Sequence, residues 1–237
     1  MPELAIDGIS WSLLLAAGTI GVLHTTLGPD HYLPFVMLAR ARGWKPWRTA
    51  MVTITCGAGH VLSSLALGAV GVAVGLSRTR LAGVEAGRGT VAAWLLVGFG
   101  VAYAVWGVRR AVRRVQGLEP HTHGGHVHLH RRGDRPHAHA QAHGGSTFWA
   151  LFIVFVLGPC EPLIPLVVVP ASQGRWTLAG AIALVFGLTT VATMVALTLI
   201  PLLGLRRLDL GPLERWSHAL AGAVIALSGM AVLWLGL

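Results

Sequence analysis

Charge is scarce in this chain of 237 residues. Only 11% of the residues are charged and only nine are acidic, whereas 54% are hydrophobic and the mean hydropathy is +0.67. An average soluble domain carries about 25% charged residues. The composition therefore excludes an ordinary soluble domain and predicts an all-α protein that crosses a membrane several times.

Two further absences limit the chemistry. The chain holds only two cysteines, which offer too little sulfur for a copper(I) site. It has no Gly-Lys phosphate-binding motif and no serine in a recognisable nucleophile elbow. We therefore expect no enzymatic activity, no direct use of ATP and no tightly bound cofactor.

Long apolar runs are what the sequence has instead. Each is close to the length of about 20 residues that crosses the hydrocarbon core of a bilayer, or exceeds it. We predict six spans, over residues 9–27, 49–76, 90–108, 148–169, 176–205 and 218–237. The apolar segment 31–39 is too short to cross alone, so we expect it to continue the first span.

The distribution of basic residues predicts the topology. The loops after the first, third and fifth spans hold 14 of the 18 lysines and arginines. The positive-inside rule places these loops in the cytoplasm and both termini outside. Topology thus explains the net charge of +9, and we expect a lipid bilayer rather than a nucleic acid as partner. The oligomeric state stays open.

Two short motifs echo each other across the chain. Residues 27–31 read LGPDH and residues 157–161 read LGPCE, each inside an apolar run. A Gly-Pro pair interrupts a helix, and membrane helices tolerate the freed backbone groups only beside a cavity or site. The sequence predicts a 3+3 inverted repeat, 1–116 and 147–237, with broken first and fourth helices. A simple packing kink is the alternative.

Side chains that bind metals lie at these breaks and on the second span. Ionisable groups in hydrocarbon are costly, so they indicate function. On the second span His60 shares a polar helix face with Cys56, which is expected to be a small buried hydrophobe. Imidazole, carboxylate and thiolate together suit a first-row divalent cation such as nickel, cobalt, zinc or iron. The candidate ligands are His24, Asp30, His31, His60, Cys160 and Glu161.

The loop between the halves, residues 117–146, is rich in histidine. Eight of the 12 histidines of the chain lie there: His121, His123, His126, His128, His130, His137, His139 and His143. Because the segment has no apolar periodicity, we expect it to be flexible. Its imidazoles would chelate metal weakly and reversibly at neutral pH. The alternative is a polar linker without a metal-binding role.

Taken together, these motifs suggest a family. The run from His24 to His31, the pair Gly59-His60, the His-rich loop and the run GPCEP resemble the nickel/cobalt transporter group that includes NicO and RcnA efflux proteins and UreH-like membrane proteins. The resemblance implies metal binding by His24, Asp30 and His31, export from a prokaryote across its plasma membrane, and a cytoplasmic metallochaperone as a partner. Five residues separate His24 from Asp30, whereas nickel permeases have four, which favours the NicO or UreH side.

Two alternatives remain. Thiol-redox membrane proteins of the CcdA and DsbD type resemble this chain in carrying a Pro-Cys pair in the fourth helix, here Pro159-Cys160. They also have a cysteine in the first helix, where this chain has Asp30, so an electron relay would need Cys56. A metal-sensing or chaperone-docking membrane subunit would also use the His-rich loop. For a transporter, exchange of metal for protons is the simplest coupling.

Overall fold

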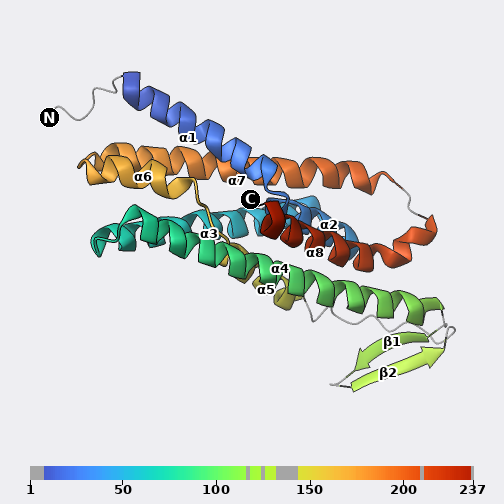
Figure 1. Cartoon of the computed structure of the whole chain (residues 1–237). Coiled ribbons are helices and arrows are strands. Elements are labelled where there is room, and N and C mark those ends of the chain that lie inside the picture. Colours follow the sequence, from blue (N-terminus) through green and yellow to red (C-terminus); the bar gives the residue numbers. More distant parts are fainter. Residues whose placement is uncertain (1–7, 116–117, 124–125, 132–143, 209–210, 236–237) are drawn as a thin grey trace.

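Long apolar helices dominate the computed structural model, which describes residues 8–115, 118–123, 126–131, 144–208 and 211–235 (Figure 1). Within these residues, five helical segments are long and apolar enough to cross a membrane. They are α1 (Gly8–Leu27), α3 (Pro46–Ala73), α4 (Arg78–Val115), α7 (Trp176–Arg206) and α8 (Ser217–Leu235), which follows the 3-10 helix η2 (Gly211–Trp216). The protein is an all-α membrane protein apart from one short hairpin.

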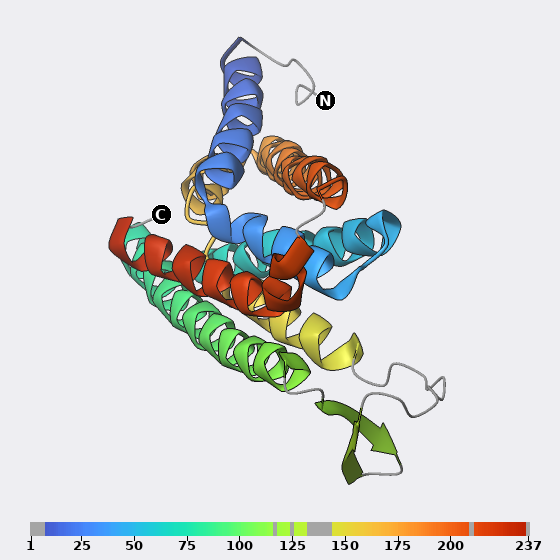
Figure 2. The same cartoon turned by 90° about the vertical axis from the view of Figure 1, so that its right-hand side faces the viewer.

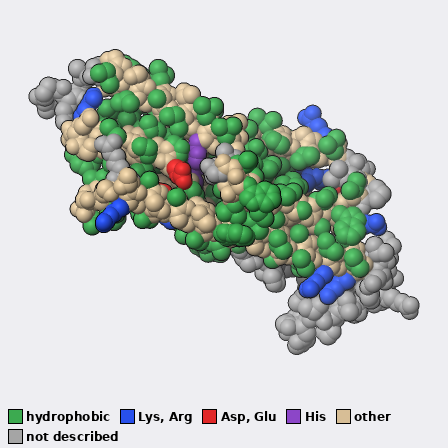
Figure 3. All heavy atoms as spheres, in the orientation of Figure 1, with side chains coloured by type: hydrophobic (Ala, Val, Ile, Leu, Met, Phe, Trp, Pro, Cys, Tyr) green, Lys and Arg blue, Asp and Glu red, His purple; other side chains and the backbone are tan. Residues whose placement is uncertain are grey.

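The outer surface fits a lipid environment. Large hydrophobic side chains stand exposed along the helices, among them Leu15 and Ile200, each 69% exposed. In Figure 3 hydrophobic side chains cover most of the visible face, and basic side chains gather toward the two ends of the molecule. An apolar surface of this extent would associate in water but is stable in a bilayer.

Both Gly-Pro pairs interrupt helices. α1 ends at Leu27, the 3-10 helix η1 (Pro29–His31) follows, and α2 (Leu33–Arg42) begins beyond it. α5 (Gly144–Leu157) ends just before the second pair, and α6 (Leu163–Ser172) begins beyond it. The predicted fourth span is therefore two helices of 14 and 10 residues, neither long enough to cross alone.

The third predicted span begins too late. α4 starts at Arg78, twelve residues before the predicted Thr90, and runs for 38 residues. The predicted span of residues 90–108 leaves Glu85 and Arg88 in the preceding loop. In the helix these two side chains lie three residues apart and form an ion pair, so the helix continues through both. At about 1.5 Å per residue, α4 is roughly 57 Å long and exceeds the hydrocarbon core.

The His-rich loop contains secondary structure that the sequence analysis does not predict, at residues 118–123 and 126–131. They form the antiparallel strands β1 (Leu118–His123) and β2 (His126–Arg131). The register places His121 opposite His128 and His123 opposite His126. The sequence between the strands is Gly-Gly, which is typical of short hairpin connections. The predicted loop residues His137, His139 and His143 lie outside the described residues.

The helices divide into a tight pair and a looser group. α4 and α8 run side by side, and a Cβ atom added at Gly100 or at Gly222 would overlap the backbone of the facing helix (Figures 1 and 2). α1, α3 and α6 pack instead against α7, and α5 packs against α3 and α4. The two breaks lie where these groups meet.

Candidate metal centre

Three predicted histidines converge from three elements. His24 lies in the last turn of α1, His31 in η1 and His60 in the middle of α3. Their ring centroids are 4.7 Å apart for His24 and His31, 5.1 Å for His31 and His60, and 6.2 Å for His24 and His60. His31 and His60 are buried, and His24 is half-buried. The rings line one cavity of about 320 Å³.

The first break brings two of these rings together. The Gly28 amide donates to the His24 carbonyl and closes α1, and the His31 amide donates to the Gly28 carbonyl at 3.1 Å. The chain thereby turns within three residues and places His31 beside His24. A Cβ atom at Gly28 would overlap the His31 ring, so only glycine fits this turn without displacing the ring.

Hydrogen bonds orient two of the rings toward the site. Nδ1 of His60 lies 3.3 Å from the Phe155 carbonyl, and Nδ1 of His31 lies 3.1 Å from Oδ1 of Asp30. Both acceptors require the hydrogen on Nδ1. Nε2 of each ring is buried and has no hydrogen-bond partner among the described residues, so its lone pair is free for a cation. Metal-binding histidines usually have this arrangement.

The second break adds a thiol. Sγ of the buried Cys160 lies 4.0 Å from Nε2 of His24. Ligand atoms of His24, His60 and Cys160 all lie within 4.8 Å of one another. Ligand bonds of about 2.0–2.3 Å in a tetrahedral site separate the ligand atoms by roughly 3.3–3.8 Å. A small inward movement of these side chains would therefore let them share one cation.

The two predicted carboxylates take different places. Asp30 is hydrogen-bonded to His31 and acts on the site by orienting that ring. Glu161 is exposed and lines the same cavity as the histidines. In Figure 3 an acidic side chain and a histidine are visible next to each other in the apolar surface. The cavity is therefore open to ions from the outside of the fold.

Cys56 lies apart from this group. It is fully buried in a hydrophobic cluster with Phe35 and Met194. Cys160 belongs to a second cluster with Phe186 and Ile182. Both thiols are free. This environment fits the prediction that Cys56 is a small buried hydrophobe.

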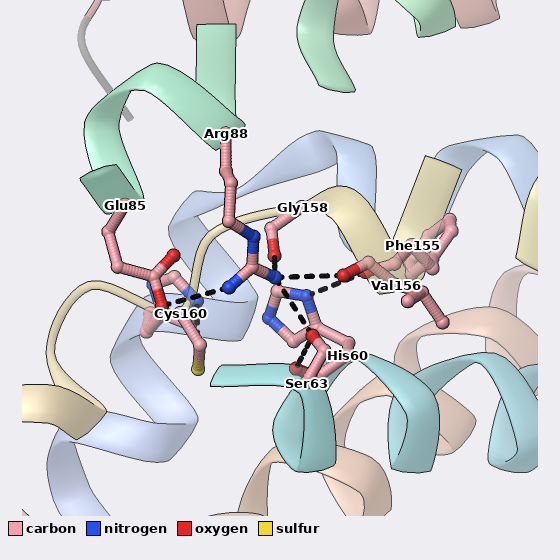
Figure 4. Close-up of polar contacts among 9 residues, drawn as sticks. His60, Ser63, Glu85, Arg88, Phe155, Val156, Gly158 and Cys160 are labelled. Atoms are coloured by element: carbon pink, nitrogen blue, oxygen red, sulfur yellow. Dashed lines mark hydrogen bonds and ion pairs between the residues drawn. The ribbon is translucent and has the colours of Figure 1, made fainter. Parts of the chain in front are cut away.

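Two charged residues that are not among the predicted ligands, Glu85 and Arg88, lie beside the site. Figure 4 shows the Arg88 guanidinium reaching from α4 to the second break, next to Cys160 and His60. It pairs with the Glu85 carboxylate at 3.2 Å. The available signal was the spacing of two opposite charges three residues apart, which permits both to lie in one apolar helix.

Comparison of the whole chain with protein-family models, with curated proteins and with solved structures finds no match.

Proposed function

We propose that the protein transports a first-row divalent transition-metal cation, nickel or cobalt foremost, across a membrane. The observation that carries the proposal is the convergence of His24, His31 and His60 with Cys160 at two helix breaks. Neutral imidazoles and a thiolate bind these cations well. Broken helices at membrane depth are also where transporters commonly bind their substrates.

The packing supports a particular topology for this transporter. We propose six crossings, with α5 and α6 together forming the fourth, arranged as a 3+3 inverted repeat. α3 packs on α7 and α4 packs on α8, and these pairs are the second and the third spans of the two halves. Such self-matching contacts are expected when two inverted halves meet around a two-fold axis.

The direction and coupling follow from the ligand types and the resemblance. Imidazole and thiolate ligands must lose their protons to bind a cation, so exchange of metal for protons would drive transport. The resemblance to NicO and RcnA proteins favours export across a prokaryotic plasma membrane, with both termini outside. In that topology the His-rich segment is cytoplasmic and would collect metal, or receive it from a metallochaperone, before export.

The environment of the cysteines weighs against the thiol-redox alternative. Exchange between two thiols needs close approach and access to a partner. Cys56 and Cys160 are both fully buried and belong to different hydrophobic clusters. A metal-sensing or chaperone-docking subunit would bind the ion at the same residues without moving it, so a measurement of flux separates that alternative from transport.

Flux into proteoliposomes tests the proposal. Purified protein is reconstituted with a metal-sensitive dye inside the vesicles, and nickel, cobalt, zinc and iron(II) are added outside. Wild-type protein should carry nickel or cobalt, and His31→Ala should abolish the flux. His218→Ala is the matched control, because His218 bonds Tyr103 at a distance from the site and should keep full flux. Wild-type flux by a well-inserted His31→Ala variant would contradict the proposal.

A further inference from the structure

The carbonyl groups at the C-terminal end of α5 need hydrogen-bond donors. The last carbonyl groups of any helix lack partners within that helix, and water is not available to them in a bilayer. α5 ends at Leu157, and five residues without helical structure follow before α6 begins at Leu163. The Gly158 amide donates to the Val154 and Phe155 carbonyls, so the carbonyls that follow need donors from another element.

Arg88 supplies these donors. Its Nη2 lies 2.8 Å from the Val156 carbonyl, 3.3 Å from the Gly158 carbonyl and 2.9 Å from Oγ of Ser63 (Figure 4). The guanidinium thus joins α4 to the end of α5 and to α3. A cation at a helix C-terminus also interacts favourably with the helix dipole.

Glu85 balances the charge of this guanidinium. Its Oε1 accepts from Nη1 of Arg88 at 3.2 Å, and the Glu85 side chain is only 1% exposed. A buried ion pair contributes little net stability, but removing one member leaves a costly unpaired charge. The ion pair therefore keeps the Arg88 guanidinium beside the second break without leaving an unpaired buried charge.

The contacts of Arg88 flank the groups that build the candidate metal centre. Phe155, whose carbonyl accepts from His60, precedes Val156, and Cys160 lies two residues beyond Gly158. We propose that Arg88 is a positioning residue: by holding the end of α5 it fixes both Cys160 and the carbonyl that orients His60. Its effect on metal binding rests on the proposed function, whereas its hold on Cys160 does not.

An arginine is required for this role. The two terminal nitrogens of the planar guanidinium reach in two directions: Nη1 donates to Glu85, and the two hydrogens of Nη2 are shared among Ser63, Val156 and Gly158. A lysine ammonium has three donors at a single point, so Arg88→Lys would keep the ion pair with Glu85 but lose contacts to the break.

Thiol reactivity tests the hold on Cys160 without any metal. In a Cys56→Ser background Cys160 is the sole thiol, and its alkylation by N-ethylmaleimide is timed in proteoliposomes. We expect Arg88→Gln and Arg88→Lys each to raise the rate about tenfold or more, because several charge-assisted hydrogen bonds are lost. Arg175→Gln is the matched control, since Arg175 bonds Ser10 far from the break, and it should leave the rate unchanged.

A double variant separates positioning from charge balance. Glu85→Gln/Arg88→Gln leaves no unpaired charge, so it should insert even if Arg88→Gln does not. Fast alkylation of Cys160 in the double variant supports the positioning role of Arg88. Alkylation at the wild-type rate in both the double variant and Arg88→Lys overturns that role.

Cobalt(II) added to the purified proteins gives an independent spectroscopic readout. Wild type should show the charge-transfer absorption of a cobalt–thiolate bond, and the Arg88 variants should lose that band while keeping the visible bands of histidine-bound cobalt. An unchanged thiolate band in these variants would overturn the positioning role in the site. If wild type binds no cobalt, nickel or zinc, the proposed function fails, and the alkylation rates still decide the role of Arg88.

Discussion

The two helix breaks share the sequence Leu-Gly-Pro, but their backbone groups are satisfied in different ways. At the first break the chain closes on itself, since the amides of Gly28 and His31 donate to carbonyls three or four residues back. At the second break the Gly158 amide closes α5 in the same way, but the Gly158 carbonyl accepts from Arg88 of another helix and not from a nearby amide. A repeated motif therefore fixes where a helix stops but not what stabilises the stop.

This difference also separates the ligands. His31 is positioned by its immediate neighbours, Gly28 and Asp30. Cys160 depends on a contact between residues 70 positions apart in the sequence, Arg88 and Gly158. Substitutions at the first break should therefore change metal affinity directly and by a large factor. Substitutions at the second break should act through the contacts that α4 makes with it.

Substitution of the two glycines should give the largest contrast. Neither has a positive φ angle, so only space opposes a side chain. A Cβ atom at Gly28 would overlap the His31 ring, whereas one at Gly158 would lie 3.3 Å from Nδ1 of His60. We expect Gly28→Ala to weaken cobalt binding about a hundredfold and Gly158→Ala about tenfold, measured by spectroscopic titration. Equal losses would contradict the difference between the breaks.

The carboxylate beside His31 should give the next largest effect. Asp30→Ala removes the acceptor that fixes the His31 ring, and outer-shell changes of this kind cost about 10–100-fold in metal affinity. Asp30→Asn keeps an acceptor and should lose less. The measurement is the same cobalt titration, with the thermal unfolding of each variant as a control. An affinity unchanged in Asp30→Ala would show that the first break does not depend on this contact.

The two cysteines should behave differently. Cys160→Ser should weaken nickel and cobalt flux several-fold and shift the selectivity among metals, because a hydroxyl is a poorer ligand for these cations. Cys56→Ser should change flux by less than about twofold, since it replaces a small buried side chain by one of similar size. Loss of all flux in both variants, together with a trapped mixed disulfide, would instead support the thiol-redox alternative.

Deletion of residues 117–146 should have the smallest effect on the site. Both breaks and all six candidate ligands lie outside this segment, so the helical core should insert and transport. The cytoplasmic metal concentration for half-maximal flux should rise a few-fold, because local capture by the histidines is lost. Below pH about 6.5 free imidazoles are protonated and release metal, so the difference from wild type should shrink as the pH falls. Complete loss of flux would place the segment in the transport pathway.

The sequence predicted those features that depend on local chemistry. Gly28-Pro29 and Gly158-Pro159 interrupt helices because glycine and proline cannot continue them at low cost, whatever surrounds them. His60 could be placed near the breaks because its helix face was polar. The 3+3 inverted repeat stays a prediction, since five helices rather than six are long enough to cross.

What the sequence missed depends on contacts across the fold. Glu85 and Arg88 looked incompatible with a membrane span, because the ion pair and the carbonyls that accept from Arg88 exist only after α4 and α5 have packed. The hairpin of β1 and β2 was missed for a related reason. Alternation of histidine with other residues gives no apolar period, although the backbone pairing of strands does not require one.

The glycine contacts between α4 and α8 have a mechanical consequence. Helices that touch through backbone atoms at Gly100 and Gly222 cannot slide along each other without first separating, so α4 and α8 behave as one rigid unit. Because Arg88 belongs to α4 and binds the Val156 and Gly158 carbonyls, it attaches the second break to this rigid unit. At the first break η1 and α2 pack on α8, whereas α1 rests mainly on α7. Cys160 and His31 are therefore both held to this rigid unit, whereas His24, on α1, is held to α7.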